Sequence, residues 1–423
     1  MQVNGIIAEY NPFHNGHKYH LEESLRRTGA DYTIVIMSGD FVQRGAPALM
    51  DKHVRARAAL CCGADLVLEL PVLYATSSAE YFAHGAVSIF DKLGVITHLC
   101  FGSECADTAL LRQTAEILLE EPSPFRHALK EFLRQGFPYP AARCRALEQC
   151  GLLSGASLEA LAQPNNILGI DYIKALLKRH SKIQPVTVKR QGPGYHDSYD
   201  YGKESHKEPS SEPSTFWSAL ALRQALFAGD SPGRLAGFMP PETSKLIAAC
   251  IDKKKLLQAE DFSSLLYYKL LLEKAQGYET YLDVSPALSR RISKLLGDFT
   301  AYETFCSLLK TRDMTYSRVS RCLLHILLNI TKDDMAAAAR LDHAPYARIL
   351  GFRRSALPLL GALGKCASIP LITKLADAQK SLSPDACRLL EQDILSSHIY
   401  QSAACVPNGS GIPNEISTPL VIL

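Results

Sequence analysis

Residues 5–17 read GIIAEYNPFHNGH, and this stretch decides the fold that we expect. The apolar run over residues 3–8 is typical of a buried strand, and a turn follows it. The pattern H-x-G-H then begins a helix, which places His14 and His17 on one face of its first turn. Gly16 has no Cβ, so a phosphate can approach the backbone, and the helix N-terminus offers free N–H groups. The stretch therefore predicts a phosphate-binding turn at the end of a strand.

The alternation of strand and helix continues through the first hundred residues. Further strands are predicted at residues 32–37, 66–70 and 96–101, and helices at residues 17–27, 54–62 and 78–93. This order is typical of a doubly wound parallel sheet, whose ligands bind beyond the carboxyl ends of the strands. Three polar turns fall at such ends, so the sequence predicts an α/β, Rossmann-like domain with one crevice.

The pattern changes after the first half of the chain. Residues 196–215 are rich in Ser, Glu, Lys and Pro and nearly without aliphatic side chains, which is typical of a mobile loop. From residue 240 onward the apolar spacing is helical, apart from a small α/β piece near the end. We therefore expect a nucleotide-binding domain at residues 1–233 and a mostly helical domain at residues 234–423.

The composition sets limits on the class of protein. The chain has 423 residues, of which 47% are hydrophobic and 21% charged, and a net charge of +3, so we expect a soluble globular protein. The small net charge neither requires nor excludes a nucleic-acid partner. No apolar run has the length of a membrane span, and no signal peptide is recognisable. The 12 Cys form no C-x-x-C pair, which favours free thiols in the cytoplasm over a metal site.

Three polar side chains in the first two turns are the candidates for catalysis. Imidazole donors from His14 and His17, aimed at an α-phosphate, would stabilise the charge that develops in the transition state. Asp40 follows the second predicted strand, where its carboxylate could bind an amine or a metal, or simply cap the next turn. We include Asp40 in the predicted catalytic set because the H-x-G-H turn is its neighbour.

Later turns supply candidates for binding a nucleotide. Gly102 follows the fourth strand and leaves room for a nucleoside against the backbone, and Asn165 stands at a helix start. Arg190 and Gln191 follow a short strand at residues 185–188. The helix start at residues 218–223 offers a hydroxyl and a guanidinium for the phosphates that leave as pyrophosphate.

Taken together, these motifs resemble the nucleotidyltransferase superfamily that is related to class I aminoacyl-tRNA synthetases. Within it, the sequence is similar to the tRNA(Met) cytidine acetate ligase family. The resemblance rests on stretches that follow one another through the first half of the chain: residues 9–17, 37–45, 63–71, 101–104, 164–169, 189–190 and 194–197.

The resemblance implies a two-step reaction with three substrates. Acetate and ATP, with Mg2+, form acetyl-adenylate and pyrophosphate, and the acetyl group then moves to N4 of the wobble cytidine of elongator tRNA(Met). It implies no resident protein-bound metal and leaves the oligomeric state open. The residues that it assigns to ATP are Ile7, Ala8, Glu9, Tyr10, Asn11, Pro12, Phe13, His14, Asn15, Gly16, His17, Lys18, Tyr19, His20, Gly102, Asn165, Arg190 and Gln191.

Two departures from the family pattern and two other functions stay open at this point. Leu220 stands where the family has Thr, so one hydroxyl near the phosphates is lost, and an insertion at residues 198–213 lengthens the preceding loop. The alternatives are a small-molecule adenylyltransferase and a catalytically inactive RNA-binding module. The long helical half, with basic runs at residues 253–255 and 290–294, favours a tRNA substrate over a small molecule.

Overall fold

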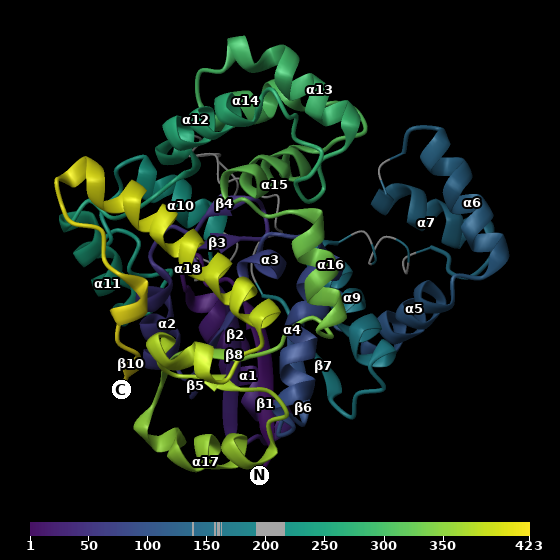
Figure 1. The fold of residues 1–423 in the computed structure, drawn as a ribbon. Helices are drawn as coiled ribbons and strands as arrows, with labels where there is room; N and C mark the ends of the chain where they lie inside the picture. The colour runs from purple at the N-terminus through teal and green to yellow at the C-terminus, as the bar shows by residue number, and fades with distance from the viewer. Residues whose placement is uncertain (138, 156–157, 159–160, 162, 192–215) are drawn as a thin grey trace, which may run out of the picture.

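The structure is a computed structural model that describes residues 1–137, 139–155, 158, 161, 163–191 and 216–423 (Figure 1). A mixed sheet forms its centre, with the strand order β10-β8-β5-β2-β1-β6-β7 and β9 beside β8. The loop predicted at residues 196–215 and the insertion at residues 198–213 lie outside the described residues.

Most strands of this sheet come from the first half of the chain and run parallel to one another. They are β1 (Val3–Ala8), β2 (Tyr32–Ser38), β5 (Leu66–Leu70), β6 (His98–Ser103) and β7 (Gln184–Lys189). The helices between them are α1 (Asn15–Thr28), α2 (Lys52–Cys61), α3 (Val72–Ala75), α4 (Ala79–Leu93), α5 (Thr108–Glu120), α6 (Ser123–Arg134), α7 (Tyr139–Gln149) and α9 (Pro164–Lys178). The predicted α/β fold on a parallel sheet is therefore confirmed.

Alternate residues of the strands pack on opposite faces of the sheet. Val35 and Met37 of β2 lie in one apolar cluster with side chains of α1 and α2. Ile34 and Ile36 of the same strand lie in the other cluster, with α3 and α4. Successive side chains of a strand point to opposite faces, so the near-continuous apolar run of each strand is explained by helices on both sides.

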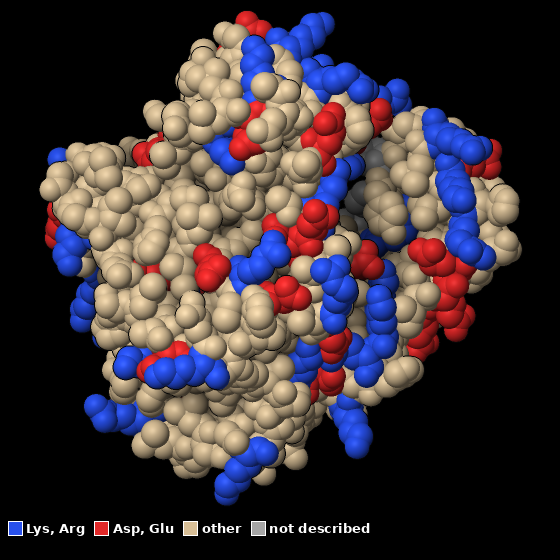
Figure 2. Space-filling view, viewed as in Figure 1, with Lys and Arg blue, Asp and Glu red and all other residues tan. Residues whose placement is uncertain are grey.

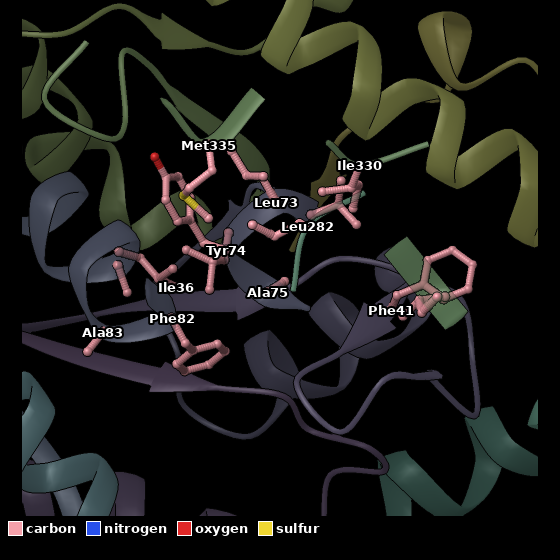
Figure 3. Close-up of a cluster of buried hydrophobic side chains, with 14 of the residues drawn as sticks. Ile36, Phe41, Leu73, Tyr74, Ala75, Phe82, Ala83, Leu282, Ile330 and Met335 are labelled. Carbon is pink, nitrogen blue, oxygen red and sulfur yellow. The ribbon is translucent and has the colours of Figure 1, made fainter. Parts of the chain in front are cut away.

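The second half of the chain completes this sheet. β8 (Ala347–Phe352) pairs antiparallel with β5, and β9 (Leu371–Ile372) and β10 (Val421–Ile422) pair parallel with β8. Figure 3 shows Leu282, Ile330 and Met335 from beyond residue 233 packed beside Leu73 and Tyr74 of α3. The division at residue 233 stays a prediction, but the sheet and the main apolar cluster include residues from both sides of it.

The remaining helices lie above and beside the sheet in Figure 1, except α17, which lies at its lower end. They are α10 (Ala219–Phe227), α11 (Pro241–Asp252), α12 (Ser263–Glu273), α13 (Pro286–Leu295), α14 (Tyr302–Leu309), α15 (Tyr316–Leu327), α16 (Lys332–Arg340), α17 (Leu357–Cys366) and α18 (Pro384–Cys405). Across the described ranges, no helix is long and apolar enough to cross a membrane.

A hairpin that was predicted only as a polar loop joins the two halves. β3 (Phe41–Val42) and β4 (Ala46–Pro47) pair antiparallel just after β2. The Gly45 carbonyl oxygen at its tip accepts a hydrogen bond from Ser320 Oγ of α15 at 2.7 Å. A Cβ on Gly45 would lie 2.4 Å from the Arg321 backbone nitrogen, and the φ of Gly45 is +80°, so only glycine permits this close contact.

Candidate active site

A cavity of about 930 Å³ opens at the carboxyl ends of β1, β6 and β7. Residues of the H-x-G-H turn, of the β3–β4 hairpin and of α7, α9, α10 and α15 line it. This is the edge of the sheet at which parallel α/β folds bind ligands. The volume lies near the upper end of the range of about 300–1,000 Å³ that is usual for small-molecule sites, which leaves space beside one ligand.

The two histidines of the H-x-G-H turn cap α1 rather than both lying within it. His14 is the N-cap residue, and its Nδ1 accepts a hydrogen bond from the Gly16 backbone N–H at 3.0 Å. The His14 backbone N–H in turn donates to His17 Nδ1 at 3.3 Å, which completes a capping box. Because both Nδ1 atoms accept, each neutral ring carries its proton on Nε2. The turn thus fixes one tautomer for both rings, and each Nε2–H remains a donor for a ligand.

Burial keeps both rings in the neutral form. Desolvation, followed by the nearby Arg190 and Arg223 guanidinium groups, lowers the pKa of His14 to about 3. Desolvation also lowers the pKa of His17 well below its usual range, with smaller effects from His14, His20 and Arg190. At neutral pH the pair therefore donates hydrogen bonds without carrying charge, and the two arginines supply the positive potential that a triphosphate requires.

Packing fixes the orientation of the pair. The two imidazole rings stack with centroids 3.8 Å apart, and the Tyr10 ring contacts His17 edge-on at 4.9 Å. A Cβ on Gly16 would lie 2.9 Å from His14 Cε1. Glycine is therefore required here for the His14 ring itself, in addition to the approach of a phosphate that the sequence predicted.

The predicted nucleoside side of the site lies at the ends of β6 and β7. A Cβ on Gly102 would meet only the Arg190 Cγ, at 3.6 Å, so the backbone there is open to a ligand. Glu104 accepts hydrogen bonds from the Asn165 side chain at 2.6 Å and from the Asn166 backbone at 3.0 Å. Arg190 Nη1 lies 3.7 Å from the same carboxylate. Glu104 thus holds Asn165 and Arg190 at the cavity; the sequence placed it in the predicted turn at residues 102–104 but gave it no role.

Most of the residues predicted to bind ATP line the cavity. They are Ile7, Ala8, Glu9, Tyr10, Asn11, His14, Gly16, His17, Tyr19, His20, Gly102, Asn165, Arg190 and Gln191. The structure does not place Pro12, Phe13, Asn15 and Lys18 in its lining. Phe13 is fully buried in an apolar cluster, and Asn15 Nδ2 donates to the Gly237 carbonyl oxygen at 2.9 Å. Phe13 and Asn15 thus support the turn from outside the cavity, whereas Lys18 forms an exposed ion pair with Glu22.

Asp40 also lies away from the cavity, so its placement does not agree with the predicted catalytic role. Its residue surface is only 2% exposed, and its Oδ1 accepts a hydrogen bond from the Lys52 backbone N–H at 2.9 Å. Burial raises the pKa of Asp40 to about 6 against the effect of the neighbouring Lys52 ammonium. The alternative that the sequence left open, a carboxylate that caps the next turn, stays a prediction: Asp40 accepts from the first residue of α2, but the N-cap residue of that helix is Asp51.

At the N-terminus of α10, some side chains hold the helix in place and others line the cavity. Ser218 caps α10 by accepting from the Ala221 backbone N–H, and Arg223 Nη1 donates to the Asn11 carbonyl oxygen at 2.6 Å. Leu220, which replaces the family's Thr, lines the cavity. Arg223 therefore connects α10 directly to the turn that carries the histidines.

The cavity includes residues for which the sequence predicted no definite role. Arg318 and Arg321 of α15, offered only among the many basic residues of the helical half that could line a groove for phosphates, line it, and so do Arg143 of α7 and Asp171 of α9. The i, i+3 spacing of the two α15 arginines was visible, but nothing in the sequence indicated which face of α15 meets the sheet. Within the described residues, no group of three or more His, Cys, Asp or Glu side chains could hold a metal ion.

Comparisons with known proteins agree with this geometry. The chain matches the HIGH Nucleotidyl Transferase family over residues 1–410. It is 39% identical to the tRNA(Met) cytidine acetate ligase of Acetivibrio thermocellus over 95% of this chain and 94% of that protein. It is 38% identical to the protein of the same name from Clostridium kluyveri over 100% of this chain and 99% of the relative.

Solved structures give the same result. The crystal structure of Thermotoga maritima TmcAL bound with alpha-thio ATP has a TM-score of 0.88 and 30% identity, and the alignment covers 100% of both chains. The apo form of that protein has a TM-score of 0.90 at the same identity and coverage. The chain therefore belongs to the HIGH nucleotidyl transferase family and, within it, to the tRNA(Met) cytidine acetate ligases.

Proposed function

We propose that this protein activates acetate with ATP and transfers the acetyl group to N4 of the wobble cytidine of elongator tRNA(Met). The observation that carries the proposal is the neutral His14–His17 pair, whose tautomer is fixed by the helix cap and whose donors lie in the cavity. The relatives named for this activity match the chain over nearly its whole length, which supports the same substrates here.

In the first step, an acetate oxygen attacks the α-phosphorus of ATP and pyrophosphate leaves. The Nε2–H donors of His14 and His17 stabilise the charge on the α-phosphate oxygens, and neutral donors held in place need no reorganisation during the reaction. Arg190 and Arg223, whose charges act on His14, stabilise the phosphates. Gly102 and Asn165 accommodate the nucleoside, together with the other predicted ATP-facing residues that line the cavity.

Mg2+ would enter with ATP rather than occupy a site made by the protein. It would be held chiefly by phosphate oxygens and water, which is usual for Mg2+ at nucleotide sites. We also propose that the protein acts in the cytoplasm, where acetate, ATP and tRNA occur together.

In the second step, the cytidine N4 attacks the acetyl carbonyl carbon and AMP leaves. The N4 lone pair is delocalised into the ring, so correct placement is the main contribution that the protein can make. The cavity is lined from both halves of the chain, and Lys and Arg side chains lie on both sides of the hollow beside α7 in Figure 2, which supports approach by an RNA strand. The basic runs predicted for this role differ in position: α11 and α13 lie at opposite sides of the molecule in Figure 1.

The experiment that tests this function measures each step separately. Acetate-dependent exchange of pyrophosphate into ATP reports the first step, and mass analysis of tRNA nucleosides for N4-acetylcytidine reports the second. Exchange with acetate but no acetylated tRNA would favour a small-molecule adenylyltransferase. Absence of exchange from a protein that still binds tRNA would favour an inactive RNA-binding module.

A further inference from the structure

Two buried charged side chains line the cavity without satisfied hydrogen bonds. Arg143 of α7 is 4% exposed and Asp171 of α9 is 8% exposed, and both line the cavity. Among the described residues, Arg143 Nε has no hydrogen-bond partner, and Nη2 reaches only the Leu161 carbonyl oxygen at 3.4 Å. Buried charged groups in proteins are normally paired and hydrogen-bonded, so this pair has capacity for a ligand.

The Asp171 carboxylate is weakly paired, although its oxygens, unlike Arg143 Nε, are not among the fully buried atoms without a partner. Its ion pair with Lys174 Nζ is long, at 3.9 Å, and Lys174 also lies 3.4 Å from Glu80. Within the part of the chain that the structure describes, no donor forms a hydrogen bond to the Asp171 carboxylate. Helices α7 and α9 therefore each contribute one charged group, a planar donor and an acceptor, to the lining of the same cavity.

The surroundings of the pair suit a flat ligand. Tyr139 is four positions before Arg143 on α7, and Leu168 is three positions before Asp171 on α9, so each lies on the same helix face as its charged neighbour. Both also line the cavity. A ring and an apolar side chain beside a charged pair resemble the way in which proteins stack and hydrogen-bond a base from a single strand.

The pair lies apart from the residues assigned to ATP. Asp171 is six positions after Asn165 on α9, which corresponds to about 9 Å along the helix axis. The cavity thus continues beyond the nucleoside side of the site.

We propose that Arg143 and Asp171 bind the edge of the target cytosine, with the carboxylate accepting from its exocyclic amine and the guanidinium donating to N3 or O2. The inference rests on the proposed function, because it takes the RNA base as the second substrate. Cytosine presents an amine beside a ring acceptor, whereas uracil presents a carbonyl oxygen that a carboxylate would repel. The pair would therefore both select the base and hold its N4 in place.

The ionisation of Asp171 gives this subsite a pH dependence. Burial raises the pKa of Asp171 to about 6, against the charges of Lys174 and Arg143 and together with the smaller effect of Glu80. Tyr139, Tyr172 and His84 are further titratable groups that interact electrostatically with members of this set of charges. The carboxylate accepts from the amine only when ionised, so binding of cytosine should weaken as the pH falls through 6.

The test uses the full-length protein and anticodon stem-loop RNAs with cytosine, uracil or 2-pyrimidinone, which lacks the amine, at the target position. The wild-type protein should bind the cytosine RNA about tenfold to hundredfold more tightly than either of the others. Asp171→Asn should remove the preference for the cytosine RNA. It should also remove the weakening of binding at low pH, because the amide does not titrate. Arg143→Met should weaken binding of the cytosine RNA.

The controls separate this subsite from the first step and from the fold. Arg145→Met changes an arginine on the same helix that stacks on Phe137 at 4.2 Å and should bind like the wild type. Acetate-dependent pyrophosphate exchange should be unchanged in all three variants. Absence of acetate-dependent pyrophosphate exchange in the wild-type protein would contradict the proposed function. The preference for the cytosine RNA would still be measured by the binding experiment. Equal binding of the three RNAs by the wild-type protein, or an unchanged preference in Asp171→Asn, would overturn the inference.

Discussion

Two groups of ionisable side chains follow neighbouring strands of the same sheet, and only one of them is open to a ligand. The His14–His17 turn after β1 lies in the large cavity. Asp40, after β2, lies in a buried cluster in which Lys52 Nζ contacts Glu69 at 2.8 Å and Glu415 at 2.9 Å. Arg348 of β8 completes this buried ion cluster through Glu69 at 2.7 Å and through Glu415.

The difference teaches that a strand end becomes a site only if later parts of the chain leave it open. Asp40 begins the polar loop after β2, and α18, β8 and the segment that carries Glu415 cover this end of the loop, whereas its later residues Gln43 and Arg44 line the cavity. The turn after β1 instead borders the cavity, which α10 and α15 also line, and Arg223 of α10 donates to the Asn11 carbonyl oxygen of this turn. Substitutions at a closed and at an open strand end should therefore differ in their effects on stability and on activity.

The largest expected effect is on stability, in the closed cluster. Lys52→Met leaves Glu69 and Glu415 buried with one cation fewer, and breaking a buried ion pair costs about 3–5 kcal/mol. Denaturant unfolding should show this loss, while pyrophosphate exchange per folded molecule stays near the wild-type value. Lys18→Met removes an exposed pair with Glu22 and should cost no more than about 1 kcal/mol.

The second prediction concerns the open turn. Loss of one preorganised donor typically lowers the rate by about two to three orders of magnitude, so His17→Ala should reduce pyrophosphate exchange by that factor. Asp40→Asn should keep exchange within a few-fold of the wild type, because Asp40 does not line the cavity. Equal losses in the two variants would contradict the distinction between the two strand ends.

Much of the open site could be predicted from local sequence, because its decisive contacts span only a few residues. The helix cap that orients His14 and His17 lies within residues 14–17. The closed cluster could not be predicted, because Lys52 meets Glu415 and Ser397, and Glu69 meets Arg348, across hundreds of positions in the sequence. The same reason explains why the α15 side of the cavity and the antiparallel pairing of β8 were missed.

The third prediction compares two glycines near the cavity. A Cβ on Gly169 would lie 2.5 Å from Phe101 Cε2, so Gly169→Ala should destabilise the fold by about 1–3 kcal/mol. Gly102→Val should leave the thermal midpoint nearly unchanged, because only Arg190 Cγ is near, but it should weaken ATP binding. Calorimetric titration with ATP, together with thermal unfolding, measures both. Unfolding of Gly102→Val would show that Gly102 has a structural role.

The smallest net effect is expected on the pH dependence of stability, because His20 and Asp40 should act on it with opposite signs. Burial lowers the pKa of His20, which lines the open cavity, to about 4, so the unfolded chain binds its proton first and stability falls as the pH drops from 6.5 to 4. The raised pKa of Asp40 makes the folded chain bind a proton first, which adds stability as the pH drops from 6 to 4.

Variants separate these two contributions. Between pH 6.5 and 4, the unfolding free energy of His20→Gln should decline less than that of the wild type, and that of Asp40→Asn should decline more. Denaturant titrations at several pH values measure both slopes. The same slope for all three proteins would show that neither group titrates differently in the folded state.

The antiparallel pairing of β5 with β8 has a consequence for the order of events during synthesis. Glu69 of β5 pairs with Arg348 of β8, which is synthesised about 280 positions later. At a translation rate of about 5–20 residues per second, the edge of β5 that pairs with β8 stays uncovered for on the order of 15–60 s. An uncovered apolar edge strand can pair with other chains. The nascent protein therefore has a long interval in which a chaperone would protect β5, and a pause in translation before residue 348 should increase aggregation more than a pause after it.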